Sequence, residues 1–285
     1  MEKIKLLIDT DIGGDIDDAL CVAMALNSAQ VDLLGMTTVY AASQWRTDLA
    51  KAMLKTWGRE DIPVHRGAER PLLGRYPHDQ GAEPQENEAV PFIIRTCREN
   101  PGLTVLAIGP LTNLALAVHL APDILKNTRF ILMGGMIGSA QPEWNIQCDP
   151  EAAAIVVEAC RPRMVGLDIT EQCRLTREEA DRLTQGDDPR LTFLKGEFDR
   201  FFGQFTFLPT LHDPLALAGI LFDGLIDWEE KEIHVETRGE RTRGTTVWNR
   251  HARESNVVWG ARVNAEEATR RIIAGVRGEG ETGDN

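Results

Sequence analysis

Five carboxylates crowd into ten residues near the start of this chain. The segment Asp9–Asp18 (DTDIGGDIDD) follows the largely apolar run Ile4–Ile8 and leads into a second apolar stretch. Like charges this close raise one another's pKa values, so a folded chain keeps them together only with a bound cation or shared protons. Hard divalent cations such as Ca²⁺ and Mg²⁺ prefer all-oxygen shells of this kind. The sequence therefore predicts a metal site where a strand ends. The simpler alternative, an acidic loop that caps a helix, needs only one carboxylate.

Composition and charge narrow the functional classes. The chain has 285 residues, 42% of them hydrophobic, which is enough for one large α/β domain or two small ones. Its net charge of −13 argues against binding to nucleic acid, which needs a cationic surface. Five cysteines without CxxC spacing predict reduced thiols. No apolar run approaches the ~20 residues of a membrane span, and a strand follows Met-Glu-Lys at once. We therefore expect a cytoplasmic protein without signal peptide or membrane segment.

Short apolar runs alternate with helical patterns over the first 170 residues. Several of the runs are apolar on both faces, which is typical of a parallel sheet covered by helices on each side. The predicted strands are Lys5–Asp9, Val31–Val39, Ile62–His65, Leu103–Ile108, Arg129–Met133 and Met164–Asp168. The predicted helices are Asp17–Ser28, Gln44–Trp57, Asn87–Glu99, Leu111–Leu120 and Pro150–Cys160. This alternation predicts an α/β fold with a Rossmann-like, mostly parallel central sheet flanked by helices, whose ligands bind at the carboxyl ends of strands.

The C-terminal part is predicted to add helices and a β-hairpin to this sheet. A helical pattern rich in phenylalanine covers Thr176–Pro209, and alternating runs on either side of Arg238–Gly244 indicate the hairpin. A last helix is expected over Ala265–Val276. Because no repeat or linker separates these segments, we expect a single domain over residues 1–276 and a flexible C-terminal tail over residues 277–285.

The Asp-rich segment resembles the first strand and loop of the inosine-uridine preferring nucleoside hydrolases. That family carries Asp-x-Asp-x-Gly-x-Asp-Asp-Ala there, and this chain has two extra residues before its paired aspartates. Three further segments match the family, which makes the resemblance specific over roughly residues 4–276. They are His212-Asp213-Pro214 at a helix start, Gly109–Asn113 after a strand, and Glu143–Ile146 followed by Asp149–Ala153.

The resemblance implies hydrolysis of the N-glycosidic bond of ribonucleosides to free base and ribose. It also implies Ca²⁺ as cofactor, a place in nucleoside metabolism such as purine salvage, and a homodimer or homotetramer. Matched residue by residue, the implied metal ligands are Asp11, Asp18, Asp213 and the carbonyl oxygen of Thr112. Asp17 takes the place of the general base, and His212 lies beside the leaving base. Glu143 and Asn145 are expected to hold the ribose hydroxyls, and His78, in the long loop Arg66–Glu86, to lie near the substrate. The role of Asp15 and the choice between purine and pyrimidine stay open.

The chemistry of these residue types is consistent with such a reaction. Cleavage of an N-ribosidic bond passes through an oxocarbenium-like sugar, whose positive charge nearby carboxylates stabilise. A metal ion can coordinate the vicinal diol of the sugar and lower the pKa of a bound water. A free carboxylate such as Asp17 can then remove the proton of that water. A histidine, with a reference pKa near ~6.5, can assist the departing base.

Two departures from the family concern the predicted sugar site. Ala42 stands where the family places a polar residue that reaches the sugar, and the short loop Gly135–Pro142 lacks an asparagine that faces the 5′-hydroxyl. Losing a hydrogen bond to a buried hydroxyl costs about 1–3 kcal/mol unless another group replaces it. Ser43, Gln44 and Gln141 are the candidates for that replacement.

Other functions and simpler roles stay open at this point. A calcium-dependent binding protein, or a catalytically weak enzyme of the same fold, would be consistent with Ala42. A haloacid-dehalogenase-like phosphatase also begins with a strand that ends in Asp-x-Asp, with Asp9 as nucleophile, but it gives no role to His212-Asp213-Pro214. His212 could simply start a helix, and Asn145 could be a loop residue that bonds to backbone.

Overall fold

The apolar runs become neighbouring strands of one sheet in the computed structural model, which describes residues 2–74 and 86–279. In spatial order its strands are β3 (Val64–Arg66), β2 (Val31–Thr38), β1 (Ile4–Thr10), β4 (Thr104–Ala107), β5 (Arg129–Met133), β6 (Arg163–Val165), β10 (Val257–Val263) and β7 (Ile226–Lys231). Each strand runs parallel to its neighbours except the edge strand β7, which is antiparallel to β10. The predicted α/β class and mostly parallel sheet are confirmed.

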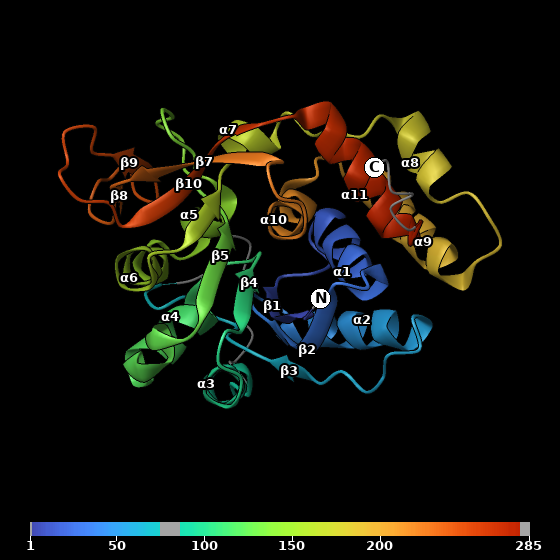
Figure 1. Cartoon of the computed structure of the whole chain (residues 1–285), viewed down its shortest axis with the longest axis horizontal. Coiled ribbons are helices and arrows are strands. Elements are labelled where there is room, and N and C mark those ends of the chain that lie inside the picture. Colours follow the sequence, from blue (N-terminus) through green and yellow to red (C-terminus); the bar gives the residue numbers. More distant parts are fainter. Residues whose placement is uncertain (1, 75–85, 280–285) are drawn as a thin grey trace.

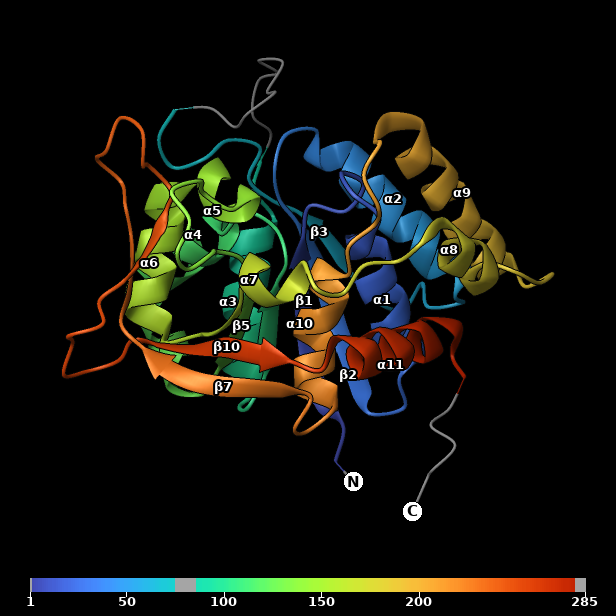
Figure 2. The ribbon, with the colours of Figure 1, turned by 90° about the horizontal axis from the view of Figure 1, so that it is seen from above.

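Helices cover both faces of this sheet (Figure 1). On one face lie α1 (Asp17–Asn27), α2 (Ser43–Thr56), α8 (Arg177–Leu183), α9 (Pro189–Gln204), α10 (His212–Leu221) and α11 (Ala265–Arg277). On the other face lie α3 (Ala89–Glu99), α4 (Thr112–Leu120), the 3-10 helix η1 (Pro122–Lys126) and α6 (Pro150–Cys160). Two short helices, α5 (Trp144–Cys148) and α7 (Leu167–Thr170), follow β5 and β6. The predicted hairpin forms from β8 (Ile233–Val235) and β9 (Thr246–Trp248) and lies beside α6 (Figure 2).

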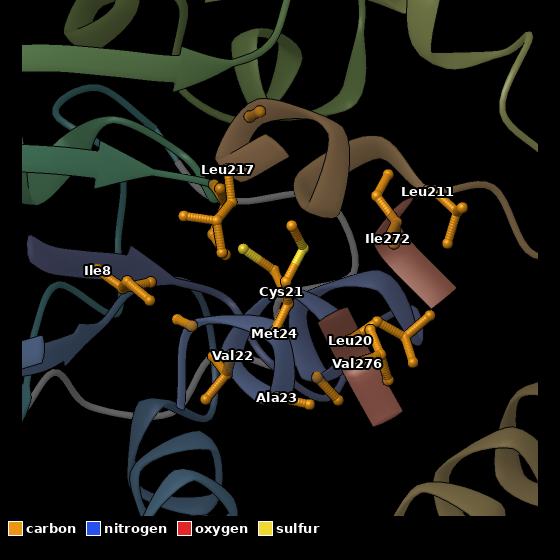
Figure 3. Close-up of a cluster of buried hydrophobic side chains, with 14 of the residues drawn as sticks. Ile8, Leu20, Cys21, Val22, Ala23, Met24, Leu211, Leu217, Ile272 and Val276 are labelled. Atoms are coloured by element: carbon orange, nitrogen blue, oxygen red, sulfur yellow. The ribbon is translucent and has the colours of Figure 1, made fainter. Parts of the chain in front are cut away.

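Helix α1 is apolar around its circumference because it is enclosed on all sides. It packs against the sheet, α10 and α11, and the labelled side chains of Figure 3 come from these four elements and from Leu211 just before α10. Residues Asp17–Ala25 are all buried. Burying a leucine or methionine side chain contributes about 1.5–3 kcal/mol, so this packing holds the start of α1, with its two aspartates, firmly at the sheet edge. No helix in the described part of the chain is long and apolar enough to cross a membrane.

Two predicted elements end three or more residues earlier than the sequence pattern indicated. The strand predicted over Met164–Asp168 stops at Val165, because Gly166 starts the helical turn α7 and the Leu167 amide donates to the Gly135 carbonyl (2.8 Å). The helix predicted over Thr176–Pro209 is two helices, α8 and α9, and the second ends at Gln204. Phe205, just after α9, is extended, and the Leu175 amide donates to the Pro209 carbonyl (2.8 Å).

The strand order places a ligand crevice at one point of the sheet edge. Successive strands run outward from β1 through β2 to β3, and the chain then returns to the other side of β1 with β4. In sheets of this kind, ligands bind outside the carboxyl ends of the strands where the order reverses. Asp11 follows β1 and Gly109 follows β4 at that point, so the fold brings two of the predicted motifs together.

The buried side chain of Asn113 joins four segments at this crevice. Its Nδ2 donates to Asp9 Oδ1 (2.8 Å) and to the Thr38 carbonyl (3.0 Å), and its Oδ1 accepts from the Ala68 amide (2.8 Å) and from Asn87 Nδ2 (3.3 Å). Asp9 Oδ2 is buried without a hydrogen-bond partner among the described residues, so the carboxylate depends on its remaining bonds.

We expect Asn113→Ala to lower the free energy of unfolding by about 3 kcal/mol, because it leaves several buried polar groups without partners. The melting temperature should fall by roughly 5–10 °C in calorimetry. Asn100→Ala, which removes one partly buried bond to the Thr96 carbonyl, is the control and should cost less than about 1 kcal/mol. Equal losses in the two variants would contradict the bridging role of Asn113.

Candidate active site

A cavity of about 560 Å³ opens at the carboxyl ends of β1, β4 and β5. The loop after β1, the starts of α1 and α10, and the segments around α5 and α7 surround it. Its lining consists of Asp11, Gly13, Gly14, Asp15, Asp17, Asp18, Tyr40, Arg46, Ile108, Met133, Glu143, Trp144, Asn145, Leu167, Gln204, Phe205, Phe207, His212 and Asp213. Most of the predicted site residues are therefore in one place.

Three of the carboxylates form a tight cluster. Asp17, Asp18 and Asp213 are buried, and one oxygen of each lies within 4.8 Å of the others. Asp17 and Asp18 are in the first turn of α1 and Asp213 is in the first turn of α10, so the packing of these two helices creates the cluster. The Asp213 amide donates to Asp17 Oδ2 (3.4 Å), and Thr10 Oγ1 donates to Asp18 Oδ1.

The electrostatics of the cluster favour a cation. Burial first, and then the neighbouring carboxylates, raise the pKa values of Asp17, Asp18 and Asp213 well above the usual range. None of the three forms an ion pair with a described side chain, and Arg46 is the only arginine or lysine among the described residues that line the cavity. Buried carboxylates that converge without a counter-charge match the all-oxygen donor set of a hard divalent cation. The residues thus fit the predicted metal.

Asp11, Asp15 and Thr112 lie outside the tight cluster. Asp11 is buried and lines the same cavity, where its charge raises the pKa values of Asp17 and Asp18. Asp15 is half-buried, and burial raises its pKa to about 6. Thr112 is buried at the start of α4 and is not among the described residues that line the cavity; its Oγ1 donates to Asp149 Oδ2 (2.7 Å).

His212 begins α10 beside the carboxylates. Its Nδ1 lies 2.7 Å from Thr170 Oγ1, and burial, aided by the charge of Arg174, lowers the pKa of the ring to about 4. The imidazole is therefore neutral at pH 7 and can offer a neutral N–H on the cavity side. Leu167 and Phe205 line the same cavity.

Glu143 and Asn145 line the same cavity and also hold the backbone around it together. The Glu143 carboxylate accepts from the amides of Asn145 (2.8 Å), Gly135 (3.0 Å) and Ile146 (3.1 Å). Asn145 Nδ2 donates to the carbonyls of Ile108 and Met133 (3.2 Å each). Asn145 thus does bond to backbone, as its simpler interpretation predicted, and it still lines the cavity. His78 lies outside the described residues.

Several residues that line the cavity were not predicted from the sequence. Tyr40 and Trp144 are 6.1 Å apart between ring centroids at one side of the cavity, and Arg46 lies 5.0 Å from the Tyr40 ring centroid. In the phenylalanine-rich segment, Phe198 and Phe201 are buried in the core, whereas Phe205 and Phe207 line the cavity. Phe205 and Phe207 follow the end of α9 at Gln204, which the sequence pattern did not indicate.

Comparisons with known proteins agree with one another. The sequence profile described as inosine-uridine preferring nucleoside hydrolase matches residues 6–270. A protein of Arabidopsis thaliana named probable uridine nucleosidase 2 is 32% identical, over 86% of this chain and 86% of its own. The pyrimidine-specific ribonucleoside hydrolase RihA of Citrobacter koseri is 33% identical, over 86% of this chain and 88% of its own.

Solved structures share the fold. A plant nucleoside hydrolase superimposes with a TM-score of 0.82 at 27% sequence identity, over 96% of this chain and 99% of that one. A purine-preferring ribonucleoside hydrolase from Gardnerella vaginalis superimposes with a TM-score of 0.83 at 24% identity, over 96% and 98% of the two chains. The arrangement of strands and helices around the cavity is therefore common to all three.

Proposed function

This chain belongs to the family of inosine-uridine preferring nucleoside hydrolases, and from that membership we propose that it hydrolyses the N-glycosidic bond of ribonucleosides to free base and ribose with the help of Ca²⁺. The observation that carries the proposal is the buried cluster of Asp17, Asp18 and Asp213, which lines a cavity large enough for a nucleoside. Membership of this family argues against the alternative of a haloacid-dehalogenase-like phosphatase.

The metal would be held by Asp11, Asp18, Asp213 and the carbonyl oxygen of Thr112. When bound, Ca²⁺ would coordinate the hydroxyls of the sugar diol and lower the pKa of the attacking water. Asp17 is the general base: it lies beside Asp18 and Asp213 and accepts the proton of the attacking water. The converging negative charges also stabilise the positive charge that develops on the sugar.

Different side chains that line the cavity hold the two halves of the substrate. Glu143 and Asn145 orient the ribose hydroxyls, and His78 is proposed to lie near the substrate as well. His212 donates a hydrogen bond to the departing base, while Leu167, Phe205 and Phe207, which line the same cavity, form an apolar surface against it. A neutral N–H next to the leaving nitrogen lets the base depart without a full negative charge.

A second candidate function is nucleoside binding without turnover. The observation that favours it is Ala42, whose exposed methyl group offers no hydrogen bond to the sugar. Measuring free base and ribose separately decides between the two. We expect equimolar base and ribose from at least one of inosine, uridine, adenosine, guanosine and cytidine. Binding of a nucleoside without release of either product would instead support the binding function.

His212→Ala is expected to lower kcat on inosine by about 10²-fold or more, the usual size of a general-acid contribution. On p-nitrophenyl β-D-riboside, whose phenolate leaves without help, the loss should stay below about tenfold. Steady-state rates on both substrates give the comparison, and Thr170→Val, which removes only the partner of Nδ1, is the control for ring orientation. Equal losses on the two substrates would mean that His212 does not assist the leaving group.

The expected domain bounds, localisation, metabolic role and oligomeric state are part of the same proposal. We propose a single nucleoside hydrolase domain over residues 1–276 with a flexible tail over 277–285, a cytoplasmic role in nucleoside metabolism such as purine salvage, and a homodimer or homotetramer. Light scattering of the purified protein measures the oligomeric state.

A further inference from the structure

The sugar contact that Ala42 cannot make has no replacement among the three candidates from the sequence. Ser43 Oγ is buried and donates to Glu69 Oε1 (2.8 Å). Gln44 is exposed and bonds to Asp48 (2.9 Å) and Arg66 (3.0 Å), and Gln141 is also exposed. None of the three is among the described residues that line the cavity. A hydrogen bond from this part of the chain to a ligand in the cavity would therefore come from another side chain.

Arg46, one turn into the same helix, lines the cavity and is 7% exposed. Its Nε donates to the Ala41 carbonyl (3.1 Å), and its Nη1 donates to the carbonyls of Ile12 (3.0 Å) and Asp11. The guanidinium thus joins the loop after β1 to the loop after β2. Its Nη2 donates to no described residue. This atom is not among the described buried atoms that lack a hydrogen-bond partner, so it is accessible to solvent.

The loop that Arg46 holds has an unusual backbone. Tyr40 and Ala42 have positive φ angles of 80° and 60°, a region that costs a non-glycine residue about 1 kcal/mol or more. Such a conformation persists only where surrounding contacts fix it, here the Arg46 bond to the Ala41 carbonyl and the Tyr40 amide bond to the Ala68 carbonyl (2.9 Å). The effect is to keep the guanidinium at the cavity wall.

A buried guanidinium with an unused donor favours an oxygen ligand. Arg46 forms no ion pair within 4.0 Å among the described residues, although its charge opposes the rise that burial causes in the pKa values of Asp11 and Asp18. Because Nη2 is accessible to solvent and lies on a residue that lines the cavity, a ligand oxygen that displaces water there can accept its hydrogen bond. The sugar is the part of a nucleoside that carries hydroxyl oxygens, and the carboxylates that Arg46 adjoins form the proposed sugar side of the cavity.

We propose that Arg46 is a substrate-binding residue, whose Nη2 donates a hydrogen bond to a ribose oxygen and so replaces the polar side chain that Ala42 lacks. This inference rests on the proposed function, because it takes a ribonucleoside as the ligand. It also makes Arg46 a positioning residue for Asp11, since the Asp11 carbonyl accepts from the same guanidinium.

The test compares a good nucleoside substrate with its 2′-, 3′- and 5′-deoxy analogues in the wild-type protein and in Arg46→Met. With the wild type, we expect one deoxy analogue to have a kcat/KM at least tenfold below that of the parent nucleoside. This ratio, the deoxy penalty, should shrink to about threefold or less in Arg46→Met. The other two penalties should stay unchanged. Because each penalty is a ratio within one preparation, a partly unfolded variant still gives a valid result. Dissociation constants from calorimetry for the same pairs provide a second readout.

Two further variants separate contact from structure. Arg46→Lys should also lose the penalty, because a lysine that reaches the loop carbonyls has no second nitrogen to offer. Arg200→Met is the matched control: Arg200 Nη1 donates to the Gly13 carbonyl (2.6 Å) in the same loop, but Arg200 is not among the described residues that line the cavity. Its deoxy penalties should equal those of the wild type.

Three results would overturn the inference. All three penalties could be the same in Arg46→Met as in the wild type, or Arg200→Met could reduce the same penalty equally. A wild-type protein that neither binds nor hydrolyses any nucleoside would overturn the proposed function along with it. A wild type that binds without hydrolysis overturns the enzymatic function alone, and the ratios of dissociation constants then decide the role of Arg46.

Discussion

Replacing Asp213 by asparagine is expected to abolish calcium binding and to lower kcat/KM by roughly 10³-fold or more, the scale seen when a principal electrostatic group leaves an active site. Asp213 is buried, its oxygen lies within 4.8 Å of those of Asp17 and Asp18, and it is the only carboxylate that α10 brings to the cluster. Asparagine keeps the shape of the side chain, so the loss would come from charge. Calorimetric titration with Ca²⁺ and steady-state rates measure the two effects.

The same variant should change stability in opposite directions with and without metal. In the metal-free protein, Asp213→Asn removes one of several buried like charges, so the melting temperature should rise. A hundredfold excess of Ca²⁺ over its dissociation constant should stabilise the wild type by about 2.7 kcal/mol and the variant not at all. Asp223→Asn changes an exposed aspartate just after the same helix and should keep the calcium response of the wild type. A variant at position 213 that still responds to calcium would exclude Asp213 from the metal shell.

Asp17→Asn is expected to lower kcat by about 10²–10⁴-fold while calcium binding stays largely intact. Asparagine cannot accept the proton of the attacking water, and the proposed calcium ligands are unchanged. The structure makes this a demanding test, since Asp17 belongs to the tight cluster and accepts from the Asp213 amide. Titration with Ca²⁺ and kcat measured on the same preparation give the answer. Asp15→Asn, at a half-buried position in the same loop, is the matched control and should change kcat little.

Each alternative outcome reassigns a residue. Loss of calcium affinity in Asp17→Asn would make Asp17 a ligand instead of the base. Unchanged turnover in Asp17→Asn, together with a large loss in Asp15→Asn, would move the base to Asp15.

Much of the fold could be predicted because its pattern is local. The strands of the parallel sheet are apolar on both faces, and α6 and β5 have the predicted bounds, Pro150–Cys160 and Arg129–Met133. The elements after residue 165 were harder, because Gly166 starts a helical turn inside an apolar run and the end of α9 depends on pairing between distant segments. Such tertiary contacts override local periodicity.

The candidate site was predictable to the level of motifs but not of geometry. The Asp-rich loop and His212-Asp213 indicated carboxylates around a metal, and the structure brings them together. The spacing of the carboxylates did not show which of them converge, nor that Gly13 has a φ of 99° and leaves room for the Trp45 ring. Arg46 gave no signal, because an arginine in a helix is usually solvated and only the strained loop before α2 brings it into the cavity.

The most direct test of a calcium-dependent ribohydrolase is ribose release before and after removal of metal. Protein treated with EDTA and then freed of chelator should release no ribose from a nucleoside that the untreated protein hydrolyses. Added Ca²⁺ should restore the rate, saturating at one ion per chain, and Asp213→Asn should not respond. Full ribose release by protein shown to be free of metal would contradict the proposed role of the carboxylate cluster.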